Sequence, residues 1–265
     1  MTLHQSCDRV RDRMGSWGIE RMSVITGTIL LERPTAPDPS KIAAEVGATL
    51  KLTPLASTDG QILTGPCGPV TAETVHRPSP LATGLAKAAW WWPEAGRAAS
   101  AHAAHLTISC PWTGLGAVEA HVRHTVLVMS VLGQVPALAV VWGGVLVSPA
   151  HFRAMFEEMV EHRRLPVPLW VRVDLARDPA GQSAASTDGL SRFGLMEIEI
   201  ERSPLEPGEL YEYTRRLAEY LITSGPVVGD GDAVGNSEAD RALVRHAPSV
   251  RPGRGTVYQL SFDRV

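Results

Sequence analysis

Three adjacent tryptophans, Trp90, Trp91 and Trp92, constrain the fold of this chain more than any other feature. Adjacent side chains point in different directions in a helix and in a strand, so one core face cannot take all three. They open a stretch, ending at Trp112, that holds four of the seven tryptophans. We expect one of the three to be deeply buried against a helix over residues 116–132, and another to reach the surface or line a cleft.

The pattern of the first half predicts strands and two helices. The apolar run 24–31 indicates a buried strand, and Asp38 before Pro39 is typical of a helix start. Apolar spacing predicts a helix over 114–133 that is buried on more than one face. The apolar run 137–147 predicts one long strand in the middle of a sheet. Three short strands are expected at residues 50–55, 61–64 and 70–75.

The second half mixes helices and strands again. Helices are expected to start at Pro149 and Pro207, the second ending at Gly225. Alternating apolar residues predict half-exposed strands at 169–175 and 196–201, and a last strand at 256–262. Residues 178–189, rich in Gly, Ser, Thr and Asp, predict a loop. Because the order lacks strict βαβ alternation, we predict an α+β fold with mixed or antiparallel sheets and packed helices.

The predicted domain organisation is a tail followed by one domain. Gly15 and Gly18 interrupt the apolar spacing of residues 1–21, which favours a loosely attached tail, and Met22 is a candidate natural start. Residues 22–265 are expected to form a single α+β domain. Two halves, 22–147 and 148–265, each resemble a split βαβ unit.

The net charge limits the class of partner that we expect, and the cysteine content indicates the cellular compartment. The net charge is −3 and no run of five like charges occurs, so we expect neither nucleic acid nor an acidic membrane surface as a partner. Cys7, Cys67 and Cys110 are scattered and odd in number, which favours a reducing compartment. Without a signal-peptide pattern or a long apolar span, the predicted location is cytoplasmic.

Histidines and aspartates supply the candidate chemistry. The pairs His102/His105 and His121/His124, with Cys110 between them, have spacing acceptable for zinc. Histidines in such positions more commonly cap a helix or pack, so we predict no metal and no cofactor. Residues 229–235 begin like a calcium loop. The calcium interpretation fails because Arg241 stands where a bidentate Glu is needed, so a tight acidic turn is expected.

Three glutamates, Glu197, Glu199 and Glu201, lie on the polar face of one predicted strand. Carboxylates in this arrangement can bind a metal or a basic partner, and more commonly form a solvated face. No GxSxG motif, phosphate-binding loop or catalytic triad pattern is evident.

Several segments, taken in order, resemble a bacterial family, domain of unknown function 4261. They are ILLERP (29–34), WWWP (90–93), HAAHL (102–106), VWG (141–143), TDGLSRFGLMEIE (187–199), DGDAVG (230–235) and RHAPS (245–249). The resemblance covers roughly Met22 to the C-terminus. It implies membership of that family and supplies neither a reaction nor site residues.

Two functional hypotheses follow. The first is a non-catalytic cytoplasmic binding protein, an immunity-type inhibitor or an adaptor, that recognises another protein with a basic surface. Its predicted binding residues are Trp90, Trp91, Trp92, Glu197, Glu199 and Glu201. The alternative is a hydrolase-like enzyme with an uncatalogued site. Its predicted residues are His102, His105, Asp230, Asp232 and His246.

Overall fold

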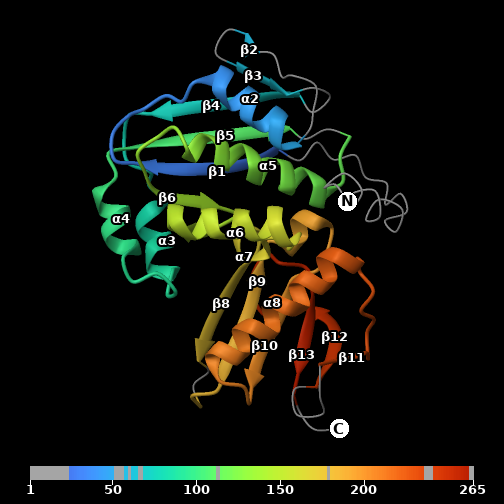
Figure 1. The fold of residues 1–265 in the computed structure, drawn as a ribbon. Helices are drawn as coiled ribbons and strands as arrows, with labels where there is room; N and C mark the ends of the chain where they lie inside the picture. Colours follow the sequence, from blue (N-terminus) through green and yellow to red (C-terminus); the bar gives the residue numbers. More distant parts are fainter. Residues whose placement is uncertain are drawn as a thin grey trace. The chain divides into compact units, whose positions relative to one another are not determined.

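The structure is a computed structural model, shown in Figure 1, that describes residues 24–50, 57–58, 61–64, 68–111, 114–177, 180–235 and 241–262. The chain divides into two compact units, Met1–Trp170 and Val171–Val265. The boundary lies later than the predicted 147/148, because helix α6 (Pro149–His162) packs against α5 (Ala117–Leu132) and β6 (Ala137–Trp142) within unit 1. The predicted tail, residues 51–55 of the strand expected over 50–55, Cys7 and Cys67 lie outside the described residues, and Leu50 ends a helix.

Unit 1 is built on a seven-stranded antiparallel sheet with the order β2-β3-β4-β5-β1-β6-β7. Its strands are β1 (Val24–Leu31), β2 (Ser57–Thr58), β3 (Gln61–Thr64), β4 (Gly68–Val75), β5 (Ala104–Pro111), β6 and β7 (Val145–Val147). Strand β1 lies between β5 and β6, so the predicted buried strand is confirmed as an interior one.

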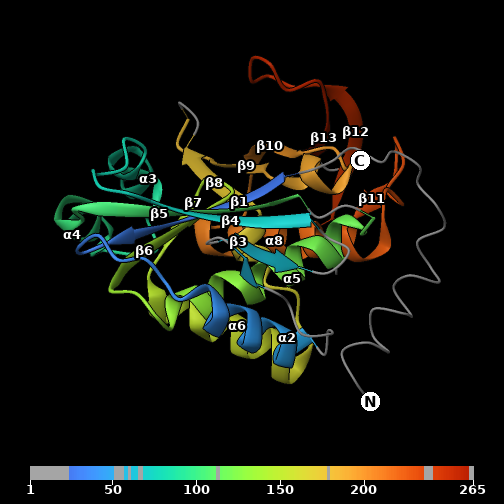
Figure 2. The ribbon, with the colours of Figure 1, turned by 90° about the horizontal axis from the view of Figure 1, so that it is seen from above.

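Helices α2 (Pro39–Leu50), α5 and α6 lie along one face of this sheet, as Figure 2 shows. Asp38 starts α2 as predicted, because its carboxylate accepts the N–H groups of Ser40 and Lys41. Helix α5 packs against α2, α6 and β1, and it is buried on more than one side as its pattern predicted. At Gly27 the approach is close: an added Cβ would lie 3.1 Å from Cγ2 of Val128.

Two short helices, α3 (Ala82–Ala88) and α4 (Ala95–Ala101), pack together beside the β6–β7 end of the sheet. Their hydrophobic cluster includes Leu30 and Ala139, which are paired across β1 and β6. Leu30 points away from the α5 face, because side chains alternate along a strand and Gly27 faces α5. The two short helices therefore cover part of the opposite face.

The predicted single strand over 137–147 is wrong. Strands β6 and β7 form a hairpin whose two-residue turn is Gly143–Gly144, with φ of 59° and 82°. Two adjacent glycines with positive φ favour the tight hairpin turn that matches strand twist. Strand β7 therefore ends the sheet instead of lying in its middle.

Unit 2 has a six-stranded sheet with the order β11-β12-β13-β10-β9-β8. Its strands are β8 (Arg172–Arg177), β9 (Ser183–Asp188), β10 (Ile198–Ser203), β11 (Ala233–Val234), β12 (Ala242–Pro248) and β13 (Thr256–Ser261). Helix α8 (Pro207–Ser224) packs against β8, β9 and β10, crossing them in Figure 1. Among the described strand pairs, β10 with β13 is the only parallel one.

Residues that are paired across neighbouring strands of this sheet form rows, and successive rows point to opposite faces of the sheet. One row is apolar and consists of Leu175, Ala185, Ile200, Leu260 and Val244, which are register partners on neighbouring strands. The next row is polar and consists of Asp174, Ser186, Glu199, Gln259 and Arg245. Because α8 buries apolar residues such as Leu210 and Leu217, we assign the apolar row to its face and the polar row to the other.

Two further local predictions are wrong. Residues 183–188 form β9, not a loop, because their small side chains fit between β8 and β10. The strand expected from residue 169 begins at Arg172, preceded by the short helix α7 (Val167–Trp170) and its fully buried Trp170.

The predicted α+β fold class is confirmed by the two mostly antiparallel sheets and their packed helices. Among the described residues, no helix is long and apolar enough to cross a membrane.

Candidate functional site

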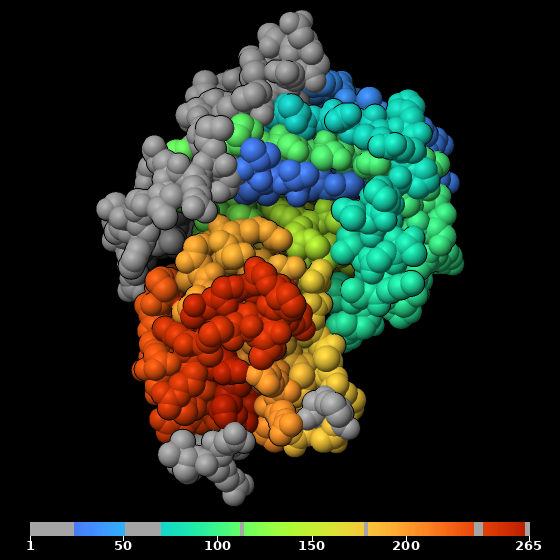
Figure 3. Space-filling view, turned by 180° about the vertical axis from the view of Figure 1, so that it is seen from behind, coloured from blue at the N-terminus to red at the C-terminus, as the bar shows by residue number. Residues whose placement is uncertain are grey.

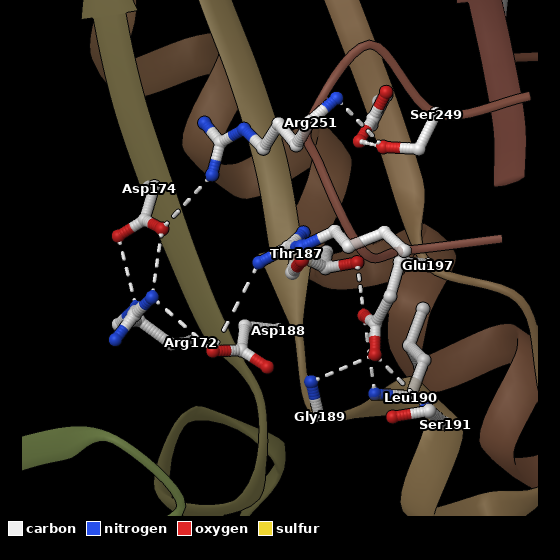
Figure 4. Close-up of polar contacts among 12 residues, drawn as sticks. Arg172, Asp174, Thr187, Asp188, Gly189, Leu190, Ser191, Glu197, Ser249 and Arg251 are labelled. Atoms are coloured by element: carbon white, nitrogen blue, oxygen red, sulfur yellow. Dashed lines mark hydrogen bonds and ion pairs between the residues drawn. The ribbon is translucent and has the colours of Figure 1, made fainter.

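The carboxylate of Glu197 is enclosed by the turn after β9 (Figure 4). Its Oε1 accepts the backbone N–H groups of Gly189 at 2.9 Å and Ser191 at 3.0 Å. Its Oε2 accepts the Thr187 hydroxyl at 2.7 Å and the N–H of Leu190 at 3.2 Å. Only 7% of the residue is exposed. These four donors satisfy a buried carboxylate and tie the start of β10 to the turn.

The pKa of Glu197 is lowered by this enclosure. Burial alone would raise the pKa, since it disfavours the charged form, but hydrogen bonds from Ser191, Gly189 and Thr187 stabilise the charge and outweigh burial. Glu197 is therefore an ionised, internally bound group.

Next to this turn, arginine and aspartate side chains form a series of ion pairs across β8 and β9 (Figure 4). Arg172 contacts Asp174 at 3.0 Å and Asp188 at 3.2 Å. Arg251 reaches Asp174 at 3.4 Å, and Arg254 reaches Asp188 at 3.9 Å. Both outer arginines come from residues 249–255, which connect β12 to β13 and are here named the connecting loop. Two ion pairs therefore hold this loop to the sheet.

Glu199 holds the beginning of the same loop. Its carboxylate accepts the Ser249 hydroxyl at 2.5 Å and the Val250 N–H at 3.1 Å. Glu199 is 2% exposed, so the prediction that Glu197 and Glu199 form a solvated face is wrong. The loop that engages Glu199 lies about fifty positions further along the chain, out of reach of local pattern.

Comparison with known families identifies this region. Residues 186–260 match the model of the family described as Domain of unknown function (DUF4261). Over this segment the chain is similar to the DUF4261 family. The match confirms the resemblance seen in the sequence over this part of the chain. No curated protein and no solved structure matches the chain.

The DUF4261 segment contains three of the five residues of the enzyme hypothesis. Asp230 accepts the backbone N–H of His246 at 2.8 Å, and Asp232 accepts that of Gly229 at 2.7 Å. The His246 ring contacts the Val228 carbonyl at 3.1 Å. These contacts confirm the tight acidic turn.

The other two, His102 and His105, precede the DUF4261 segment and belong to unit 1. The His102 ring joins the Ala99 carbonyl at 2.6 Å to the Ser79 N–H at 2.8 Å, and the His105 ring contacts the Arg77 carbonyl at 2.8 Å. Each ring thus contacts backbone groups of unit 1. The enzyme hypothesis remains a prediction.

The second histidine pair is packed into the core of unit 1. His121 and His124 are buried in α5, and both rings lie against Trp142, at centroid distances of 6.2 and 4.9 Å. Burial, and then the neighbouring His121, lower the pKa of His124 to about 3. In the part of the chain that the structure describes, no group of three His, Cys, Asp or Glu residues is placed to hold a metal ion.

The tryptophan cluster follows α3 in unit 1, in the teal segment at the surface in Figure 3. Trp90 is 52% exposed, and its ring meets Trp91 edge-on at 5.7 Å and 82°. Trp91 and Trp92 are half-buried against the α3–α4 cluster. The expectation of a deeply buried member packed on residues 116–132 is wrong, because the α3–α4 cluster lies on the opposite face of the sheet. The expectation of a surface member is confirmed by Trp90.

Sequence reasoning missed most of the polar contacts in unit 2. Glu201, exposed as predicted, accepts the Gln259 side chain at 2.5 Å. The arginines of the connecting loop gave only a weak signal, two basic residues spaced three apart among Pro and Gly. Their acidic partners, Asp174 and Asp188, lie more than sixty positions earlier, so spacing could not join them.

Proposed function

We propose that the chain is a non-catalytic binding protein that recognises another protein through a surface centred on Trp90. The observation that carries the proposal is the exposed indole: 52% of Trp90 is open while Trp91 supports its ring edge-on. Tryptophan is enriched among the residues that dominate binding energy. A ring already fixed by its neighbours also loses little rotamer freedom on binding.

The charges around Trp90 favour an apolar anchor over electrostatic attraction. The exposed charged neighbours along the chain are Lys87, Glu94 and Arg97, which are of mixed sign. Glu197 and Glu199, which underlay the predicted basic partner, are bound internally. Of the three glutamates, only Glu201 is exposed, so only one of the three carboxylates remains to attract a basic partner. We therefore propose a partner with an apolar pocket for an indole.

The biological class is also part of the proposal. An immunity-type inhibitor and an adaptor would both present a rigid anchor of this kind. A cytoplasmic site of action and a bacterial origin remain predictions, the first from the cysteine pattern and the second from the family resemblance.

Site-specific photo-crosslinking in cells that naturally carry the gene would find the partner. A photoreactive phenylalanine replaces Lys87, an exposed residue three positions before Trp90, in one variant and Tyr220, which is 50% exposed on α8, in the control, so that Trp90 itself stays in place. The captured protein is then purified, and its affinity is measured for Trp90→Ala and Tyr220→Ala. We expect Trp90→Ala to weaken binding by about 30-fold or more, as hot-spot truncations do, and Tyr220→Ala by less than about twofold. Equal affinities for the two variants would reject the Trp90 surface.

A further inference from the structure

A buried hydroxyl in unit 2 has no hydrogen-bond partner within the described parts of the chain. Ser186 on β9 is 2% exposed, and its Oγ contacts no donor or acceptor there. Its register partners are Asp174 on β8 and Glu199 on β10. Directly paired residues point to the same face, so the hydroxyl stands between two carboxylates. A buried hydroxyl without a partner is uncommon and points to a bound group at the site.

The flanking carboxylates retain capacity to accept hydrogen bonds. Asp174 is approached by Arg172 and Arg251, and Glu199 by Ser249 and the Val250 N–H. A carboxylate offers about four lone-pair positions, so these contacts leave some of them unused. The carboxylates of Asp174 and Glu199 can therefore accept further hydrogen bonds from a donor group placed over Ser186.

The charges of the cluster do not balance. Among the described residues, Asp174 and Asp188 each have arginine partners, whereas the buried Glu199 accepts only a hydroxyl and a backbone N–H. The charge of Glu199 is therefore the excess negative charge beside Ser186. Partly buried charges are normally compensated, so a single positive charge fits this site.

We propose that Asp174, Ser186 and Glu199 bind a small ammonium group, either a free amine or the side chain of a lysine. An ammonium group carries three N–H donors and one positive charge, which match the three acceptors and the excess charge. A water molecule would satisfy the hydroxyl but leave the charge uncompensated. This inference is independent of the Trp90 surface, which belongs to unit 1.

Access requires the connecting loop to move, and its attachments are suited to that. The loop is held at Asp174, Asp188 and Glu199 by polar contacts, while its apolar Val250 is 61% exposed. Partly exposed ion pairs contribute little each, so the loop can lift without disturbing the apolar row beneath α8.

The test measures the melting temperature of the full chain in ammonium and methylammonium chloride, with tetramethylammonium chloride at equal ionic strength as the control. Tetramethylammonium carries the same charge but no N–H donor. At about ten times the dissociation constant we expect a rise of about 3 °C with the donors, and none with the control. Nα-acetyl-lysine amide tests the second source: a rise shows that a lysine side chain also enters, and its absence restricts the site to small free amines.

Two serine variants locate the effect. Ser186→Ala is expected to fold, because it removes a hydroxyl that has no hydrogen-bond partner among the described residues, and to lose the ammonium-specific rise. Ser183→Ala, at a buried serine of the same strand on the opposite face, should keep it. A bound signal from 15N-labelled ammonium should likewise vanish only in Ser186→Ala. The proposal is overturned if tetramethylammonium stabilises equally, or if Ser186→Ala responds like the parent chain.

Discussion

The indole N–H of Trp170 donates a hydrogen bond to the hydroxyl of Thr125 at 3.1 Å, and both side chains are fully closed to solvent. The contact joins α7 to α5 in the core of unit 1. Trp170→Ala removes a large apolar volume together with this bond, so we expect a loss of about 3–5 kcal/mol in the free energy of unfolding. Trp90→Ala should lose less than about 1 kcal/mol, because that ring is half exposed. Chemical denaturation of both variants measures the difference, and similar losses would contradict this assignment of buried and surface tryptophans.

Glu197→Gln should destabilise the chain by about 2–4 kcal/mol. An amide keeps one acceptor oxygen and places an NH2 donor where the other oxygen was. Either the N–H groups of Gly189 and Ser191 or the N–H of Leu190 then lack an acceptor. Glu201→Gln is the matched control, since Glu201 is exposed on the same strand and should change stability by less than about 0.5 kcal/mol. Urea unfolding measures the loss in each variant. A Glu197→Gln variant with an unchanged free energy of unfolding would show that the turn does not need the charge.

The same carboxylate predicts a dependence on pH. Because the pKa of Glu197 is lowered in the folded chain, its stabilisation is complete above the unfolded pKa of about 4.3 and is lost as the pH falls toward the folded value. The stability difference between the parent chain and Glu197→Gln should therefore shrink in acid. Denaturant titrations at a series of pH values test this, and a difference that stays constant would rule it out.

His124 predicts destabilisation at milder acidity. Burial, followed by the charge of His121, lowers the His124 pKa to about 3, so between the ordinary pKa of 6.5 and about 3 the unfolded chain binds a proton that the folded chain does not. Stability should thus fall as pH falls, by about 2 kcal/mol from pH 7 to pH 5 for this group. His124→Gln should lack this component of the slope. An NMR titration showing His124 protonated at pH 6 would contradict the prediction.

Gly27→Ala should destabilise unit 1 by about 1–3 kcal/mol, because the new methyl group would crowd Val128 at 3.1 Å and the His124 ring at 3.4 Å. Gly84→Ala on α3 is the contrasting variant. Its added Cβ meets nothing within 4 Å, so it should stabilise by about 0.5–1 kcal/mol through higher helix propensity. Thermal melts should shift in opposite directions, and a neutral Gly27→Ala would show that α5 can move away from β1.

The local sequence pattern predicts the positions of helices and strands better than it predicts which strands pair. The helix start at Asp38 and Pro39 and the apolar periodicity of α5 depend on neighbours within a few positions, and both were correct. The apolar run over 137–147 was misread because uniform apolarity shows burial but not direction, and the turn depended on Gly143 and Gly144. Strand β9 was missed since its stability comes from β8 and β10, not from its own small residues.

The candidate site was harder to predict than the fold. An alternation of Glu and Ile reads as a solvated strand face, yet Glu199 is covered because Ser249 and Val250 bind it. Trp90 was predictable in kind, since three consecutive indoles cannot share a core, while its identity as the exposed member required the position of α3.

The parallel pairing of β10 with β13 sets the order in which unit 2 can assemble. Strand β13 is inserted between β10 and β12, so the sheet cannot close until residues 256–261 have been synthesised and have left the ribosome. Contacts between β10 and β13 join positions about sixty apart, a separation that slows folding because a long loop must close first. A nascent chain stopped before β13 would expose the open edges of both β10 and β12, making this stage of synthesis the one most exposed to mispairing and aggregation.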